Sequence, residues 1–247
     1  MPVKKLIIIL LALLLFASAV FIAATSYRKY KISKLLEELT TDETADEFED
    51  LPDNPVDFAA LKEANDEIYA WISIPHTEIE LPILQSKVDD LYYVKRGIDG
   101  KYTRLGSIFS QSHNSLDFSD PVTVLYGHNY ITGGMFTNLH YFEDKDFFDK
   151  NEYMYIYTPG HLLTYRIVSA YKYDDRHILN TFDFSDADVI SEYFNYVMNP
   201  ASLTKNVRDG VVLDDKDRLL VLSTCLTYGY KGRYLVNGVL ISDENTK

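Results

Sequence analysis

The chain contains a single cysteine, Cys225, among its 247 residues. One cysteine excludes an intramolecular disulfide, a Cys-x-x-Cys redox pair and a cysteine-based zinc site. The thiol is therefore either packed as a small apolar side chain or reactive.

Spacings typical of metal and nucleotide sites are also missing. The histidines form no His-Glu-x-x-His or similar ligand pattern, and the glycines form no phosphate-binding fingerprint. We therefore expect no metal and no cofactor. Apart from His128, the histidines lie in segments that we predict to be turns and surface helices, and we expect them to be solvated: His76, His113, His140, His161 and His177.

Positive charge is scarce, with 24 Lys and Arg against 37 Asp and Glu and a formal net charge of −13. This balance argues against a nucleic-acid partner, because a run of phosphates would not be neutralised. Hydrophobic residues make up 47% of the chain and charged residues 25%, a globular composition. The 20 Tyr and 13 Phe favour a β-rich body.

One long apolar run stands near the N-terminus. Leu6 to Ala24 is 19 residues long and uncharged, and Lys4 and Lys5 precede it. About 20 helical residues cross a bilayer, so we expect residues 1–25 to form a transmembrane anchor. A cleaved signal peptide is the alternative, since Ala17-Ser18-Ala19 suits signal peptidase. The apolar run continues beyond that point, which favours the anchor.

The orientation of the anchor does not follow from its flanking charges. Arg28 and Lys29 follow the run, so basic residues lie on both sides of it and the positive-inside rule selects neither. The lone cysteine, the acidic body and the signal-like start favour an extracellular domain on a single-pass membrane protein.

Residues 26–56 are expected to be a juxtamembrane helix followed by an acidic linker. Thr41 to Asp57 carries eight acidic residues and no basic one, which is typical of a solvated spacer. The globular domain is then expected over residues 57–247, which is ample for one core.

Short strands between turn signals dominate this domain, and the pattern predicts a mainly β fold, a closed or half-closed β-barrel with peripheral helices. We expect helices over Asp57–Trp71, Asp186–Met198 and, as one or two short helices, Met135–Phe148. We expect strands over Trp71–Pro75, Ile79–Ile83, Gly106–Phe109, Pro121–Tyr126, Arg218–Thr224 and Tyr234–Ile241, with a hairpin of Glu152–Thr158 and Leu162–Tyr173 turned at Pro159-Gly160.

Cys225 lies at the exit of a buried strand rather than within it. A nucleophilic thiol needs a base or a cation nearby, because the thiolate is the reactive form. Arg233 begins the return strand of the same hairpin, and His128 ends the strand Pro121–Tyr126. If those two strands are neighbours, thiol, imidazole and guanidinium meet at one end of the barrel.

This arrangement resembles the sortase family. The segment Leu222-Ser223-Thr224-Cys225, with Arg233 eight residues after the cysteine and Tyr126-Gly127-His128-Asn129 before it, carries the resemblance, which extends from about Asp57 to Ser242. The family usually has Thr where this chain has Val221. Further segments are similar to class B sortases: Trp71–Pro75, Leu81–Gln85, Gly106–Phe109, the segment from Met135-Phe136 through Phe147-Phe148, and the helix Asp186–Met198.

The resemblance implies a cysteine transpeptidase on a Gram-positive-type cell surface. It implies Cys225 as nucleophile, His128 as acid and base, and Arg233 as the cation that stabilises the oxyanion. The enzyme would cleave a C-terminal sorting-signal pentapeptide after Thr and pass the secreted protein to an amine acceptor, either a cell-wall precursor or a pilin lysine. Tyr126 and Ser223 match positions that line the substrate groove of the family.

Two alternatives from other classes stay open. A cysteine endopeptidase would use the same residues but resolve the acyl enzyme with water, although a papain-type Cys-Gly-Ser-Cys-Trp segment is missing. A membrane-anchored binding module would have Cys225 merely packed in its core.

Overall fold

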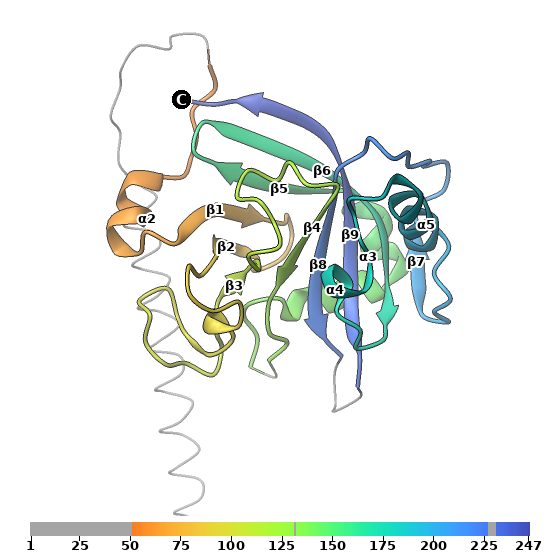
Figure 1. Ribbon diagram of the computed structural model, residues 1–247, viewed down its shortest axis with the longest axis horizontal. Coiled ribbons are helices and arrows are strands. Elements are labelled where there is room, and N and C mark those ends of the chain that lie inside the picture. Colours follow the sequence, from red (N-terminus) through yellow and green to blue (C-terminus); the bar gives the residue numbers. More distant parts are fainter. Residues whose placement is uncertain (1–50, 131, 227–230) are drawn as a thin grey trace, which may run out of the picture. The chain divides into compact units, whose positions relative to one another are not determined.

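The structure is a computed structural model that describes residues 51–130, 132–226 and 231–247 (Figure 1). The predicted membrane anchor and most of the predicted linker lie outside these ranges. Within them, no helix is both long and apolar enough to cross a bilayer.

Strands dominate the described part of the chain. The strands are β1 (Ile68–Ser73), β2 (Glu80–Leu84), β3 (Ile108–Phe109), β4 (Val122–Tyr126), β5 (Tyr153–Thr158), β6 (His161–Tyr173), β7 (Lys205–Val207), β8 (Leu219–Cys225) and β9 (Arg233–Asn245). The helices are α2 (Phe58–Ala64), α3 (Lys145–Lys150), α4 (Ile178–Thr181) and α5 (Ala187–Met198), with 3₁₀ turns η1 (Tyr92–Lys95) and η2 (Thr137–Glu143).

The strands form one sheet in the order β5-β1-β2-β3-β4-β8-β9-β6-β7. Because β5 also pairs with the first half of β6, the sheet closes on itself into a barrel of eight strands, as the sequence predicts (Figure 1). The remaining strand, β7, lies outside the barrel order and pairs with the second half of β6. Two neighbouring pairs, β2–β3 and β4–β8, are parallel.

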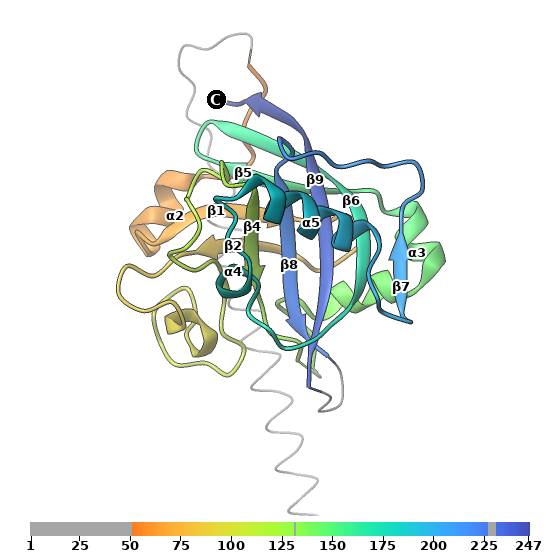
Figure 2. The ribbon, with the colours of Figure 1, turned by 45° about the vertical axis from the view of Figure 1, so that its right-hand side comes forward.

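Alternate residues of β8 face two different cores, as the two-residue period of a strand requires. Leu220 and Leu222 belong to the cluster that fills the barrel. Leu219 and Val221 belong to a second cluster, on the outer face of the sheet, that α5 covers (Figure 2). Val221, which stands where sortases usually have Thr, thus packs as an apolar residue beneath α5.

Helix α5 forms for local reasons that the sequence displays. The Asp186 side chain caps its first turn by accepting from the Asp188 N–H at 2.9 Å. Its buried residues recur at helical spacing, Ile190, Tyr193, Phe194 and Val197. The predicted boundaries of this helix are confirmed to within one residue.

The predicted helix over Asp57–Trp71 is wrong in its second half. Helix α2 ends at Ala64, because Asn65 adopts an extended conformation, and β1 begins at Ile68. The first five residues from Ile68 are all buried. The apolar side chains of this segment therefore pack on both faces of a buried strand rather than on one face of a helix.

The remaining elements largely follow the prediction. The hairpin of β5 and β6 turns at Gly160, whose φ of +85° favours glycine. The predicted short helices over Met135–Phe148 are confirmed as η2 and α3. Three short elements were not predicted: η1, α4 and β7.

The first described residues contact the end of the chain. The backbone N–H of Asn54 donates to the Lys247 carbonyl at 2.8 Å, and the Lys247 N–H donates to the Pro52 carbonyl at 3.1 Å. The Asn54 amide group also donates to Thr246 Oγ1 at 3.0 Å. The last residues of the predicted linker therefore pair with the C-terminal end of β9.

Candidate active site

Strand register brings Cys225 and Arg233 together. They are the last paired residues of the antiparallel β8–β9 hairpin. The guanidinium Nη1 of Arg233 donates a hydrogen bond to Cys225 Sγ at 3.0 Å. Cys225 is neither fully buried nor fully exposed. The predicted contact between these two residues is confirmed.

The β4 and β8 strands are parallel neighbours, which was the condition for His128 to join the site. Tyr126 pairs with Ser223, so the residues that follow both strands leave the same end of the barrel. Thr224 Oγ1 donates to the Gly127 carbonyl at 2.9 Å and locks the two strand ends together. His128 and Cys225 are thus brought to one rim.

Among the described residues, the His128 ring makes no hydrogen bond to the Cys225 thiol. Instead, His128 Nε2 lies 2.7 Å from the Val94 carbonyl oxygen, in η1. A carbonyl only accepts, so Nε2 carries the proton, and Nδ1 is the nitrogen that can exchange a proton with a reactant.

A small cavity adjoins Arg233, and the two predicted substrate-binding residues line it. Tyr126 and Ser223 form its wall together with Arg233. The other lining residues come from the end of β6 and the segment that leads into α4: Tyr173, Asp175, Arg176, His177 and Ile178.

Tyr126 is a rigid part of this wall. Its ring stacks on Phe109 with centroids 5.5 Å apart. Its hydroxyl is buried and has no hydrogen-bond partner among the described residues. Burial raises the pKa of the Tyr126 phenol, so the hydroxyl stays a neutral donor at physiological pH.

His177 is held in one tautomer at the edge of the cavity. Its Nδ1 accepts from the Asn180 N–H at 3.2 Å, so Nε2 bears the proton and donates to Gln111 Oε1 at 2.6 Å. Burial lowers the pKa of His177 below its ordinary value, and the neighbouring His113 lowers it further. The expectation that this histidine is solvated is wrong.

His140 also departs from that expectation. Its Nε2 lies 3.1 Å from the carbonyl oxygen of Cys225, and its Nδ1 lies 2.7 Å from Glu143 Oε1. The ring stacks on Tyr234. Sequence reasoning missed this residue because η2 is expected at the surface and nothing in its spacing relates it to β8.

No group of His, Cys, Asp and Glu in the described ranges could hold a metal ion. The side chains at the rim are a thiol, a guanidinium that donates to it, and an imidazole whose Nδ1 makes no hydrogen bond among the described residues. This set can form and resolve an acyl enzyme.

The sortase-domain family model matches residues 72–241, a range that begins near the end of β1 and includes all three rim residues and most of β9. The chain belongs to the sortase family. It is a sortase-type cysteine transpeptidase, and the relatives reported below are class B sortases.

Sortase B of Listeria monocytogenes is 33% identical over 190 residues, which cover 74% of this chain and 73% of that protein. The crystal structure of Clostridium perfringens sortase B is 30% identical, with a TM-score of 0.67, covering 74% of this chain and 99% of the other. Sortase B from B. anthracis in complex with AAEK1 is 27% identical with a TM-score of 0.73, covering 88% and 98%. Both the strand arrangement and the sequence therefore agree with class B.

Proposed function

We propose that this sortase cleaves a sorting-signal pentapeptide after Thr, keeps the protein as a thioester on Cys225 and transfers it to an amine. The observation that carries the proposal is the hydrogen bond from Arg233 Nη1 to Cys225 Sγ at 3.0 Å. A guanidinium at this distance can donate to the attacking sulfur and can stabilise the charge that develops on the scissile carbonyl oxygen.

In the first half-reaction, the Cys225 thiolate attacks the carbonyl carbon that follows the Thr side chain. The negative charge moves to the carbonyl oxygen, where Arg233 and a nearby backbone N–H stabilise it. His128, as an imidazolium, delivers a proton from Nδ1 to the departing amine, because Nε2 is engaged by the Val94 carbonyl. The peptide bond breaks and a thioester remains.

In the second half-reaction, the neutral His128 takes a proton from an incoming amine as that amine attacks the thioester. The thiolate of Cys225 leaves and the new amide forms, which restores the starting charges. Tyr126 and Ser223 would contact the bound peptide, since both line the cavity beside Arg233. The acceptor is a cell-wall precursor or a pilin lysine.

The proposed site of action is the outer face of the cell membrane. The support is the uncharged run from Leu6 to Ala24, which is long enough to serve as a single-pass anchor. Full-length protein should fractionate with membranes, and protein that starts near residue 51 should be soluble. A mature N-terminus at Val20 would show that the run is a cleaved signal.

The test of the reaction is product analysis by mass spectrometry. A library of pentapeptides that contain Thr is incubated with the protein, with and without an added amine such as triglycine. We expect a thioester adduct on Cys225 and an amide product when the amine is present. Hydrolysis alone, unaffected by the amine, would establish an endopeptidase. Failure of Cys225 to react with iodoacetamide in the folded protein would favour a binding module.

A further inference from the structure

Two side chains converge on the backbone carbonyl of the nucleophile. Asn129 Nδ2 donates to the Cys225 carbonyl oxygen at 3.2 Å, and His140 Nε2 lies 3.1 Å from the same oxygen. We propose that His140, supported by Glu143, is a positioning residue that acts with Asn129 to orient the peptide group after Cys225. This inference rests on the proposed function, because that peptide group adjoins the reacting sulfur.

The protons of this cluster can be assigned from its donors and acceptors. Glu143 is 2.7 Å from His140 Nδ1, and a carboxylate only accepts, so Nδ1 carries a proton. The Asn129 amide nitrogen has two hydrogens, and it lies 3.0 Å from His140 Nε2 as well as within reach of the Cys225 carbonyl. Glu143 thus orients His140, and the neutral ring in turn orients the Asn129 amide toward Cys225.

The His140 ring is held on its other sides as well. It stacks on Tyr234, the residue after Arg233, with centroids 5.0 Å apart and planes inclined by 27°. Its side chain is only 15% exposed. A ring held by stacking and by hydrogen bonds at both nitrogens has little freedom to turn, which is what a positioning role requires.

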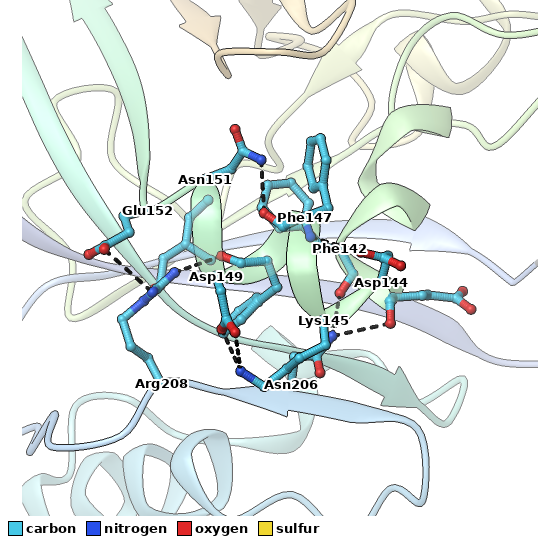
Figure 3. A network of polar contacts seen from close by, with 12 residues as sticks. Phe142, Asp144, Lys145, Phe147, Asp149, Asn151, Glu152, Asn206 and Arg208 are labelled. Carbon is cyan, nitrogen blue, oxygen red and sulfur yellow. Dashed lines mark hydrogen bonds and ion pairs between the residues drawn. The ribbon is translucent and has the colours of Figure 1, made fainter.

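The turn that carries His140 is hydrogen-bonded to β7, the last strand in the order of the sheet. Asn206, in β7, donates from its amide to the carbonyls of Phe142 and Glu143 at 2.8 and 3.2 Å (Figure 3). Arg208 donates to the Phe148 carbonyl at 2.9 Å and so fixes the following helix α3 (Figure 3). The short strand β7 and the residue that follows it therefore hold η2 and α3 in place through hydrogen bonds.

Holding the Cys225 carbonyl has a direct consequence for the next amide. The C=O of Cys225 and the N–H of Leu226 share one planar peptide group and point in opposite directions. The Leu226 N–H donates to the Gly232 carbonyl only at 3.4 Å, longer than the usual 2.7–3.2 Å. This N–H is weakly engaged and lies one residue from the nucleophile, so its direction depends on the contacts made by the carbonyl.

The experiment compares two substitutions of His140 that separate hydrogen bonding from packing. His140→Phe keeps a ring on Tyr234 but removes both nitrogens, whereas His140→Gln removes the ring but keeps an amide oxygen that can accept from Asn129. We expect His140→Phe to lower kcat for peptide cleavage roughly 10-fold or more with KM unchanged, since misplacement of a reacting group is costly. His140→Gln should retain more of the activity. If Phe is the better substitute, the role is packing and the proposal is overturned.

A spectroscopic readout makes the test independent of turnover. Because the chain has one cysteine, labelling with ¹³C-carbonyl Cys and ¹⁵N-Leu gives a single carbonyl–amide cross-peak, from Cys225–Leu226. Without His140 to orient the Asn129 amide, the hydrogen bond from Asn129 to the carbonyl should weaken, which should move the carbonyl carbon signal upfield in His140→Phe. An unshifted signal would overturn the proposal even if activity falls, and a shifted signal with wild-type kcat would overturn it as well.

The chain offers a matched control in His161, which also contacts a carboxylate, Asp243, at 2.9 Å. It lies at the far end of β6 from Tyr173, which pairs with Arg233. His161→Phe should leave both the cross-peak and kcat unchanged. Wild-type protein that forms no thioester with any pentapeptide would refute the proposed function. A wild-type enzyme that is active and unaffected by His140→Phe would refute only this inference.

Discussion

The guanidinium of Arg233 donates to the sulfur of Cys225 at 3.0 Å, across the last residue pair of the β8–β9 hairpin. The contact is a product of register, because an antiparallel ladder places paired residues side by side. A charged donor interacts more strongly with a thiolate than with a neutral thiol, so this geometry prepares the sulfur for attack.

Substituting Arg233→Lys should therefore lower kcat about 10²-fold or more, as the loss of an oxyanion donor does. Lysine keeps the charge but loses the planar fork that can contact the sulfur and a developing oxyanion at fixed geometry. Peptide-cleavage kinetics and melting temperatures measure the two effects separately, and we expect little change in Tm. Arg176→Lys, at an exposed arginine that lines the same cavity, is the control. If Arg233→Lys keeps a kcat near that of the wild type, backbone N–H groups rather than Arg233 stabilise the oxyanion.

Cys225→Ala should abolish both cleavage and thioester formation while leaving the barrel folded. The residue lies at the strand end and is only half-buried, so the missing sulfur creates no closed cavity. Mass spectrometry of peptide mixtures and circular dichroism check the two parts. Substantial residual cleavage by this variant would remove Cys225 from the mechanism.

Tyr126→Phe should raise the KM for the peptide roughly 10-fold while leaving Tm equal or slightly higher. The hydroxyl is buried at the cavity wall without a partner in the described residues, so its removal costs the free protein nothing, whereas a bound peptide would lose a hydrogen bond. Tyr193→Phe removes another buried hydroxyl without a partner in the described residues, on the buried face of α5, and should leave KM unchanged. Equal KM values in all three proteins would mean that the Tyr126 hydroxyl does not contact the peptide.

The sequence predicts the closed barrel and its main strands because their signals are local. The apolar run of β8 and the turn of the β5–β6 hairpin at Gly160 can be read within a few residues. The strand β7 could not be predicted, since it has only three residues and its function depends on contacts that Asn206 makes with a turn more than 60 residues away.

The site residues also differ in whether their contacts are local in the sequence or form only in the fold. Arg233 can be assigned to Cys225 from the sequence because it stands only eight positions later in the same hairpin. His140 lies 85 residues from Cys225, and only the folded barrel brings its ring to the carbonyl. His177 is likewise brought to the cavity by the end of β6. A histidine in a predicted surface turn carries no local sign of such contacts.

Gly127→Ala should destabilise the protein by about 1–3 kcal/mol, the usual cost of overpacking. A Cβ at this position would lie 2.5 Å from Ile108 Cδ1 and 2.7 Å from the Phe136 ring. The resulting shift would also displace His128, so cleavage should fall with stability. Denaturant unfolding provides the measurement, with Gly97→Ala as control, because there the nearest atom is the mobile end of Asp99. Unchanged stability in Gly127→Ala would show that the barrel end can relax.

The pKa of His177 gives a pH dependence whose sign can be worked out. Burial first, and then His113, lower its pKa in the folded protein below the ordinary value of about 6.5, while Asp90 raises it slightly. Well above pH 6.5 the ring is neutral in both the folded and the unfolded state. As the pH falls below 6.5, the unfolded chain takes up the proton and the folded protein does not, so the contribution of His177 to stability is lost.

We therefore expect His177→Asn to reduce the acid sensitivity of the fold. Asparagine can still cap α4 by accepting from the Asn180 N–H, but it does not titrate. The measurement is Tm for both proteins between pH 7.5 and 5. The wild type should be the more stable at pH 7.5, where it keeps the bond to Gln111, and its advantage should shrink toward pH 5. His161→Asn, at an exposed histidine, gives the reference for a change of residue type alone. Parallel Tm curves for wild type and His177→Asn would mean that the ring titrates alike in the folded and unfolded states, and that its place at the cavity edge has no consequence for stability in acid.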